Sequence, residues 1–572
     1  MNDVLSSGAR WLADGILAAT PIVYFSVLSV ISLYGFHKVL MIWRFYKYQD
    51  SYRAKYAARE HVAEKHSLEK CSSKKLSNQF VVANQSVATR VTQTTRSPIT
   101  RSPITYTPIN YSQTSHRHPK CIQVQHSVSQ TFATEAFPSV TVQLPIFNEL
   151  YVVERLLDAI ARLHYPPNKL EIQVLDDSTD ETQYVCQQKV AALQRQGLNI
   201  RYIRRPHRKG FKAGALDYGL QQAAGELITI FDADFVPMPD TLLRLVHSFA
   251  DPAVGMVQAR WSHLNRQYSL LTEIQALMLD GHFVIEQTSR SRSGCFFNFN
   301  GTAGVWRASA IADAGGWQHT TVTEDLDLSY RVQLKGWRCL YLPHIVVPAE
   351  LPAEMNSFYS QQFRWAMGAS QVARKLLGSV FRAPVPFHVK CEAFFHLTNN
   401  FNYLLMMVLL LLSFPYQVYI TQHEWSYGVL AYLPLLGMTT LNLVCFYWVS
   451  QREQRPVLSS WRLLSRIFCL LSVGIGMSLN QSLAVCDGFL GAGADFVRTP
   501  KHGIITKSEK WKTKIYRGAK TWGLCLEMLM VVYLAFTIAF ALHHGNYSSL
   551  PFLLMFFTGY CYVLTLGLFQ RR

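Results

Sequence analysis

Long uncharged runs constrain this chain more than any other feature of its sequence. The first extends from Gly15 to Phe36, 22 residues without a charged side chain. A helix of that length is long enough to cross the ~30 Å hydrocarbon core of a bilayer. The run lacks the basic start and the shorter apolar region of a cleaved signal peptide, so we expect a retained membrane helix within residues 1–43. Charged residues make up only 16% of the chain, against about 25% in ordinary soluble domains, which supports the same conclusion.

Five further apolar segments follow in the C-terminal part of the chain, at roughly 397–420, 427–449, 466–486, 522–542 and 548–570. The segment at 466–486 is the most polar of these, because it contains Gly474, Gly476, Asn480 and Gln481. A full crossing there would also place the basic segment that follows it outside the cell, against the positive-inside rule. We therefore expect an interfacial or re-entrant course for 466–486 and five spans in all, where a strict hydropathy count gives six.

The net charge of +18 is strongly basic, and its location excludes nucleic acid as the obvious partner. Residues 44–136 hold 14 Lys and Arg against 5 Asp and Glu, and residues 495–523 hold 8 against 2. Both stretches flank apolar segments, where basic residues mark the cytosolic side of a membrane protein. Residues 44–137 are also rich in Ser and Thr and contain a tandem RSPIT repeat, which is typical of a flexible cytosolic linker, although a partner-binding segment is the alternative.

Residues 138–380 have the pattern of a soluble α/β domain. Short buried strands are predicted at Val140–Leu144, Ile172–Leu175 and Leu227–Phe231, with amphipathic helices at Val152–Leu163 and Thr182–Gln196. This alternation predicts a parallel, doubly wound sheet, whose ligands bind beyond the carboxyl ends of the strands. Residues 381–572 then form a membrane domain with interfacial helices.

Four polar clusters occur in order through the α/β domain, two of them directly after predicted strands. They are Asp176-Asp177-Ser178, Asp232-Ala233-Asp234, Thr323-Glu324-Asp325 and Gln361-Gln362-Phe363-Arg364-Trp365. A strand-terminal Asp-x-Asp fits Mg²⁺ or Mn²⁺, which prefer carboxylate oxygen and retain substrate phosphates as further ligands. A single Asp in such a place is as often a helix cap or a turn residue. Because all four clusters occur in order on a predicted doubly wound sheet, a ligand-binding site explains them better than coincidence does.

The series of motifs resembles the processive family-2 glycosyltransferases, in the cellulose-synthase-like branch that includes glucomannan mannosyltransferases and xyloglucan backbone glucan synthases, with bacterial relatives. The matching motifs are PIFNE (145–149), LDDSTDET (175–182), HRKGFKAGAL (207–216), FDADF (231–235), FNFNGTAGVWR (297–307), TEDLDLSYR (323–331) and QQFRW (361–365). A loop near 495–502 is similar to the gating-loop motif of cellulose synthases, with Arg498 in place of the motif's Val.

The resemblance implies a GT-A type transferase domain joined to multi-span membrane helices, with a role for each matching residue. The nucleotide sugar would be bound by Pro145, Asn148, Glu149, Asp176, Asp177, Lys212 and Asp232, and a divalent metal (Mg²⁺ or Mn²⁺) by Asp234. The acceptor and diphosphate would be held by Gly301, Thr302, Glu324, Gln361, Arg364 and Trp365, and the gating loop would use Phe496, Thr499 and Lys501. Asp325 would be the general base. One base without a protein nucleophile implies direct displacement with inversion.

Several of these residues have ordinary alternatives. Trp365 is also placed where a membrane-interface aromatic would lie. Arg208, Lys209 and Lys212 lie in a glycine-punctuated loop and could contact phosphate, and a solvated basic loop is the alternative. His263, His282 and Glu286 are interpreted as polar-face residues of a helical stretch and are not assigned to the site.

The resulting hypothesis is a multi-pass membrane glycosyltransferase with a cytosolic catalytic domain that extends a β-linked polysaccharide. UDP-glucose is favoured narrowly over GDP-mannose as donor, and a bacterial inner membrane over the Golgi or plasma membrane. Single transfer to a lipid acceptor, as in the ceramide glucosyltransferases, is the alternative within enzymes. A non-enzymatic transport or scaffold subunit is the alternative outside them, but Asp232, Asp234, Asp325 and the Arg-Trp pair are all retained.

Overall fold

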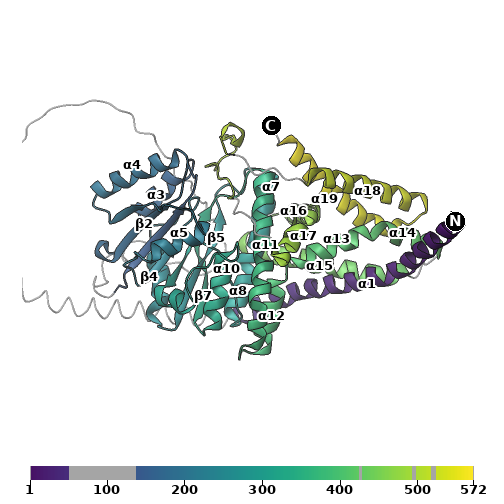
Figure 1. Ribbon diagram of the computed structural model, residues 1–572, viewed down its shortest axis with the longest axis horizontal. Helices are drawn as coiled ribbons and strands as arrows, with labels where there is room; N and C mark the ends of the chain where they lie inside the picture. The colour runs from purple at the N-terminus through teal and green to yellow at the C-terminus, as the bar shows by residue number, and fades with distance from the viewer. Residues whose placement is uncertain (1, 50–136, 424–427, 492–497, 517–522, 571–572) are drawn as a thin grey trace, which may run out of the picture. The chain divides into compact units, whose positions relative to one another are not determined.

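The computed structural model describes residues 2–49, 137–423, 428–491, 498–516 and 523–570, so the expected linker at 44–137 lies almost wholly outside the described residues. Within them, seven strands form one mixed sheet in the order β3-β2-β1-β4-β6-β5-β7 (Figure 1). The strands are β1 (Val140–Ile146), β2 (Leu170–Asp176), β3 (Ile200–Ile203), β4 (Leu227–Ile230), β5 (Val254–His263), β6 (Gly304–Arg307) and β7 (Arg338–Ala349). The three strands expected from the sequence are therefore confirmed within two residues at each end.

The sheet departs from the expected all-parallel arrangement at one strand. β6 runs antiparallel to both of its neighbours. Its Arg307 pairs with Leu227 of β4, and its Trp306 pairs with Met256 of β5. The chain enters β6 from a turn beside the carboxyl end of β4, where the Ala303 amide donates to the Ile230 carbonyl at 2.8 Å. A strand that starts at the carboxyl edge must run back from it, so the prediction of a wholly parallel sheet was wrong here.

Helices lie on both faces of the sheet (Figure 1). They are α3 (Val153–Ala161), α4 (Thr182–Arg195), α5 (Phe211–Leu220), α6 (Thr241–Val246), α7 (Leu270–Asp280), α8 (Gln287–Arg292), α9 (Ala308–Asp313) and α10 (Glu324–Leu334). Single turns occur at η2 (Pro167–Lys169), η3 (His247–Ala250) and η4 (Gly281–Glu286), the last of which is π-helical. The two helices expected from the sequence correspond to α3 and α4.

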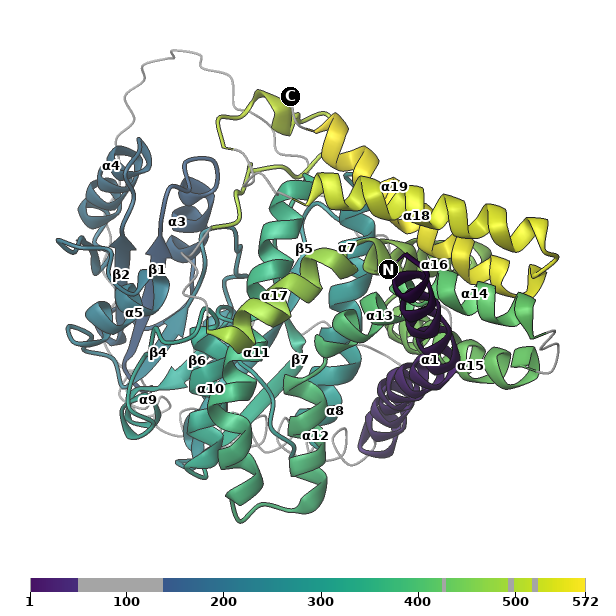
Figure 2. The same cartoon turned by 45° about the vertical axis from the view of Figure 1, so that its right-hand side comes forward.

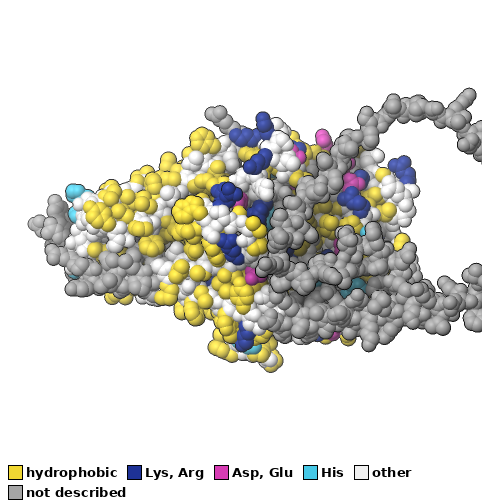
Figure 3. Space-filling view, turned by 180° about the vertical axis from the view of Figure 1, so that it is seen from behind, with side chains coloured by type: hydrophobic (Ala, Val, Ile, Leu, Met, Phe, Trp, Pro, Cys, Tyr) yellow, Lys and Arg dark blue, Asp and Glu magenta, His cyan; other side chains and the backbone are white. Residues whose placement is uncertain are grey.

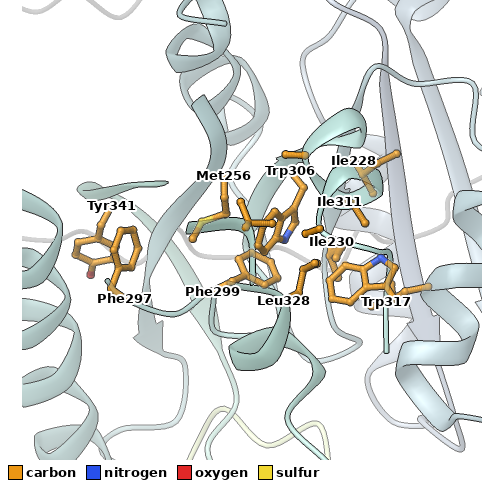
Figure 4. Close-up of a cluster of buried hydrophobic side chains, with 14 of the residues drawn as sticks. Ile228, Ile230, Met256, Phe297, Phe299, Trp306, Ile311, Trp317, Leu328 and Tyr341 are labelled. Atoms are coloured by element: carbon orange, nitrogen blue, oxygen red, sulfur yellow. The ribbon is translucent and has the colours of Figure 1, made fainter. Parts of the chain in front are cut away.

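The core of the transferase domain lies between this sheet and the helices that follow it. Trp306 and Phe299 are fully buried and pack with Ile230 and Met256, as Figure 4 shows. The Trp306 ring meets the Trp317 ring edge-on, with 6.2 Å between centroids. Each large side chain buried in this way contributes roughly 1.5–3 kcal/mol. The cluster fixes the position of β6, and with it the turn that precedes β6 in the site.

The rest of the described chain is helical. It comprises α1 (Asn2–Lys47), α11 (Met355–Arg382), α12 (Phe387–Leu397), α13 (Phe401–Leu411), α14 (Ser413–Gln422), α15 (Gly428–Gln454), α16 (Ser460–Gly476), α17 (Ser478–Leu490), η5 (Trp511–Thr513), α18 (Leu524–His543), η6 (Tyr547–Ser549) and α19 (Leu550–Phe569). Although α1 is remote in sequence, it packs along α13, α14 and α15 (Figure 2). The Ser32 and Thr439 hydroxyls are 2.8 Å apart across its contact with α15.

Three described helices are long and apolar enough to cross a membrane: Leu17–Lys47, Leu524–His543 and Tyr547–Phe569. Two bent pairs, α12 with α13 at 57° and α16 with α17 at 51°, raise the number to five if each pair is one span. Large apolar side chains face outward on these helices (Figure 3), among them Ile22 at 70% and Val532 at 60% exposed. Exposed apolar surface of this kind suits lipid contact.

Two expected segments differ from straight spans. The 466–486 segment is broken at Met477 between α16 and α17, a bend that accommodates either a broken span or the re-entrant course expected from its polar residues. The 397–420 segment is divided between α13 and α14 at Leu412.

Candidate active site

The carboxyl edge of the sheet gathers the acidic motifs, as expected for a doubly wound fold. Residues 147–149 follow β1, Asp177 follows β2, and Asp232 and Asp234 follow β4. Asp325 lies in the first turn of α10, and Arg364 and Trp365 come from α11. Residues hundreds of positions apart therefore surround one cavity of about 200 Å³.

Most of the predicted site residues line this cavity. They are Pro145, Glu149, Asp177, Lys212, Asp232, Asp234, Gly301, Glu324, Asp325, Gln361, Arg364, Trp365, Thr499 and Lys501. Three described residues of the prediction do not. Asp176 and Thr302 are buried behind the wall, and Asn148 is partly exposed and accepts a hydrogen bond from the Thr179 amide. Phe496 lies outside the described residues.

Asp176 and Thr302, which are buried behind the cavity wall, hold neighbouring backbone in place by hydrogen bonds. Asp176 is 1% exposed and accepts hydrogen bonds from the Ser178 amide and the Tyr202 hydroxyl, both at 2.8 Å. Thr302 is fully buried, and its Oγ1 accepts from the Asp232 amide at 2.8 Å. Since Asp176 already has partners on both oxygens, its position suits shaping the loop after β2 better than contacting a ligand.

Asp325 carries the electrostatics expected of a base. Burial raises the pKa of its carboxyl to about 7, with the neighbouring Glu324 carboxylate adding to the rise and the Lys212 ammonium opposing it. The Leu326 amide donates to Asp325 Oδ1 at 2.8 Å, which fixes the carboxylate in the first turn of α10. A base works best when its pKa lies close to the working pH, so this environment is suitable for proton abstraction near neutrality.

Lys212 joins two walls of the cavity. Its Nζ donates to Asp232 Oδ1 at 2.5 Å and to the Gly301 carbonyl at 3.0 Å. Gly301 has a φ of +81°, and a Cβ built there would lie 3.0 Å from Asp325 Oδ2. The turn before β6 therefore needs glycine both for its left-handed backbone and for the space beside Asp325.

Asp234 is held from the C-terminal segment. Lys501 Nζ donates to Asp234 Oδ2 at 2.8 Å, and the Glu350 amide donates to the same oxygen at 3.1 Å. Among the described residues, no cluster of three or more His, Cys, Asp and Glu could hold a metal ion. Mg²⁺ in phosphate-handling sites usually takes one or two carboxylates and completes its shell with substrate phosphates and water. The carboxylates of Asp232 and Asp234 fit that donor set, and Lys212 and Lys501 lie beside them.

Arg498, where the sequence departs from the gating-loop motif, has a defined partner. Its NH1 lies 3.0 Å from Glu149 Oε1, and its guanidinium lies 4.2 Å from the centre of the Tyr516 ring. Burial nevertheless raises the pKa of Glu149 to about 8, with the Arg498 charge opposing the rise. Residues 498–516 therefore contact the loops at the carboxyl edge of the sheet directly.

Sequence reasoning missed several residues that line the site. Glu350 and Arg498 were not assigned. Arg208, a candidate for phosphate contact, also lines the cavity, with its guanidinium carbon 3.4 Å from the centre of the Phe147 ring. The interpretation of His263 as part of a helical stretch was wrong, because His263 ends β5; it lines the cavity and lies 3.3 Å from Asp280. No local signal marks Glu350, because its partner Asp234 is 116 positions away.

The transferase domain of this chain matches a known protein family. Residues 138–368 match the family described as "Glycosyltransferase like family 2". Together with the mixed sheet and its acidic edge, this match defines a GT-A type glycosyltransferase domain, here joined to helices that can span a membrane.

Plant relatives extend the match beyond this domain. "Probable glucomannan 4-beta-mannosyltransferase 3" of Oryza sativa subsp. japonica is 34% identical over 428 residues, 72% of this chain and 74% of its own. "Glucomannan 4-beta-mannosyltransferase 2" of Arabidopsis thaliana is 45% identical over 256 residues, less than half of either chain (43% and 47%). The chain belongs to the processive family-2 glycosyltransferases, in the cellulose-synthase-like branch, and is a membrane-embedded hexosyltransferase.

Among solved structures, "Mannosyltransferase PcManGT from Pyrobaculum calidifontis in complex with GDP-Man and Mn2+" is similar to this chain. It has a TM-score of 0.40 at 24% identity, and the match covers 57% of this chain and 89% of that one.

Proposed function

We propose that this protein transfers mannosyl residues from GDP-mannose to the growing end of a β-1,4-linked glucomannan or mannan. The first support for this proposal is the 34% identity with "Probable glucomannan 4-beta-mannosyltransferase 3" over 72% of the chain. The second is the cavity that Asp325, Asp232 and Lys212 line together. The narrow preference for UDP-glucose drawn from motifs has no support from these relatives, so GDP-mannose replaces it. The relatives are plant proteins, which favours the Golgi or plasma membrane over a bacterial inner membrane.

In the proposed reaction, Asp325 removes the proton from the attacking hydroxyl of the acceptor. The hydroxyl oxygen forms a bond to the anomeric carbon, while the bond from that carbon to the phosphate oxygen breaks and its electron pair leaves with GDP. Attack and departure occur on opposite faces of the sugar, so the configuration inverts. The proton ends on the Asp325 carboxylate, whose raised pKa suits this task.

Cationic side chains in the cavity could contact the departing diphosphate. Lys212, Arg364 and Lys501 all line the cavity, so they are available to stabilise charge that develops on the phosphate oxygens. Asp234, with Asp232, would hold a divalent metal, which neutralises and orients the diphosphate. Trp365 offers a flat face to the acceptor sugar, and Arg364 is tied to Thr499 by a hydrogen bond of 3.3 Å.

The proposed division of the chain assigns residues 138–380 to sugar transfer, residues 1–43 and 381–572 to the membrane, and residues 44–137 to a cytosolic linker. Segment 495–502 would act as the gating loop. Its described residues Arg498 and Lys501 lie within ion-pair distance of Glu149 and Asp234, and these two contacts support the proposal.

The test is product identification with purified protein in lipid. Radiolabelled GDP-mannose, GDP-glucose and UDP-glucose are supplied separately with Mg²⁺ and Mn²⁺, and the product is extracted with organic solvent and digested with an endo-β-mannanase. We expect label from GDP-mannose in an insoluble, mannanase-sensitive polymer. Label from UDP-glucose alone, or label recovered only in the solvent phase, contradicts the proposal and points to a glucan or a glycolipid product.

A further inference from the structure

Residues 498–516 are held against the loops at the carboxyl edge of the sheet by packing as well as by charge. Trp511 and Ile504 are buried in one apolar cluster. Gly503 has a φ of +68°, and a Cβ built there would lie 2.6 Å from the Tyr151 carbonyl oxygen. Any other residue would have to displace backbone at that point, so the close contact with Tyr151 requires glycine. The course of this segment is therefore fixed before it reaches its last described residue.

Two tyrosines join the end of this segment to the loop after β1, residues 147–151. The Leu150 amide donates to the Tyr516 hydroxyl at 3.2 Å. In return, the Ile515 amide donates to the Tyr151 hydroxyl at 3.1 Å. The two tyrosine rings meet edge-on, with 5.4 Å between their centroids. Each tyrosine thus binds backbone next to the other, which fixes the spacing between segments 364 to 366 positions apart in the chain.

The Tyr516 hydroxyl also reaches a third segment, the loop after β2 at residues 177–181. It donates to Asp180 Oδ2 and lies 3.5 Å from Thr182 Oγ1 at the start of α4. Burial raises the pKa of Tyr516 to about 12, and the hydrogen bond to Asp180 adds to the rise. The phenol therefore stays protonated near neutrality, so it can donate to Asp180 while it accepts from Leu150. One hydroxyl group joins three segments of the chain.

The loops after β1 and β2 also bind each other at Asn148. Its Oδ1 accepts from the Thr179 amide at 2.8 Å, and its own amide donates to Ser178 Oγ at 2.8 Å. Asn148 has a φ of +54°, a left-handed conformation that Asn adopts more readily than most residues. The two loops therefore form one unit, and Tyr516 joins that unit to the C-terminal segment.

The joined loops supply part of the wall of the active-site cavity. Phe147 and Glu149 of one loop and Asp177 of the other line it, whereas Tyr516 and Asp180 are outside its lining. Oε2 of Glu149 is buried and has no hydrogen-bond partner among the described residues. Native proteins rarely leave such an atom unsatisfied, so a ligand in the cavity is a suitable partner for it. Tyr516 can therefore act on a ligand through the position of these loops, without touching it.

We propose that Tyr516 and Asp180 are positioning residues for the nucleotide-sugar donor. Their hydrogen bond holds the loops after β1 and β2 at the spacing that the donor requires, and it acts through Glu149 and Asp177. Neither Tyr516 nor Asp180 lines the cavity that contains Asp325, so loss of their bond weakens donor binding and leaves the chemical step intact. The inference rests on the proposed function for the identity of the donor, a GDP-linked sugar.

The test measures nucleotide affinity and steady-state transfer on full-length protein in lipid nanodiscs. Tyr516→Phe keeps the ring beside Arg498 and removes only the hydroxyl. We expect the Kd for GDP and the KM for GDP-mannose to rise about threefold to tenfold, as for one lost hydrogen bond, while kcat is retained. Tyr184→Phe is the matched control and should leave all three values unchanged, because Tyr184 is 67% exposed on α4 and lies outside the cavity.

Asp180→Asn and the double variant show whether the two residues act together. Asn keeps the size of the side chain but weakens the bond, because the acceptor loses its charge. Since both single changes affect the same hydrogen bond, the double variant should raise the Kd for GDP no further than Tyr516→Phe does. Effects that multiply in the double variant would mean that the two residues act independently, which contradicts the inference.

The Kd for GDP also separates positioning from stability alone. If Tyr516→Phe lowers the melting temperature but leaves this Kd unchanged, the contact is only structural and the inference is overturned. A fall in kcat without a change in the Kd overturns it as well. Should Tyr516→Phe fail to fold, Asp180→Asn provides the same measurement. If wild-type protein binds GDP but transfers no mannose from GDP-mannose, the proposed function fails, and the Kd for GDP in the variants still decides the inference.

Discussion

Replacing Asp325 with Asn removes the base while keeping its size and its place in the first turn of α10. General bases contribute typically ~10²–10⁴-fold to a rate, so kcat should fall by at least the lower of these factors. Donor binding should survive, because the groups proposed to hold the diphosphate, Lys212, Asp232 and Lys501, are unchanged. Asp313→Asn on α9 is the matched control, since Asp313 is exposed and does not line the cavity.

The pH dependence follows from the position of the Asp325 pKa, which burial raises to about 7. The carboxylate form is the active base, so wild-type activity should be full above that pH and fall as pH decreases through it. About a tenth of the enzyme retains the ionised base one pH unit below the pKa, which predicts a roughly tenfold fall in kcat/KM per unit on the acid side. Asp325→Asn should lose this limb of the profile.

The assay combines initial rates of labelled sugar transfer between about pH 5.5 and pH 8.5 with GDP affinity measured separately. The reasoning is refuted if Asp325→Asn transfers sugar at the wild-type rate, or if it loses GDP affinity together with activity. Glu324→Gln is then the next variant to measure, because Glu324 lines the same cavity and its carboxyl pKa is also raised, chiefly by burial.

Three shorter predictions concern the metal, the C-terminal segment and its side of the membrane. Excess EDTA should abolish transfer and added Mg²⁺ or Mn²⁺ should restore it, because Asp232 and Asp234 alone would repel the diphosphate; full turnover in chelator would rule out the metal. Arg498→Val removes the guanidinium that lies 3.0 Å from the buried Glu149 carboxyl and should lower the thermal stability and the donor affinity, with partial recovery in Arg498→Lys; wild-type values for Arg498→Val would show that this contact has no role. Ser508→Cys, in a chain without other reactive cysteines, should be labelled by a membrane-impermeant maleimide only after permeabilisation, and labelling on intact cells would contradict the assigned side.

Features that depend on a short stretch of sequence were predictable, and features that depend on contacts between distant residues were not. The strands at 140–146, 170–176 and 227–230 were predictable because each is a short apolar run followed directly by polar or acidic residues. β6 was not, because four residues carry no clear pattern and its antiparallel direction depends on where the preceding turn is anchored. The same distinction separates Asp325, recognisable from its motif, from Glu350, whose contact with Asp234 depends on the tertiary structure.

The amino-acid sequence by itself determined where the long apolar segments lie, the transferase motifs and their order, because hydrophobic run length and motif spacing are properties of the chain alone. Only the tertiary structure decided that Lys38 of the first helix lies beside Glu286 and that Lys501 reaches Asp234. These pairs join residues 248 and 267 positions apart. Such contacts depend on how buried charges find partners once helices and sheet have packed, and no local pattern specifies that choice.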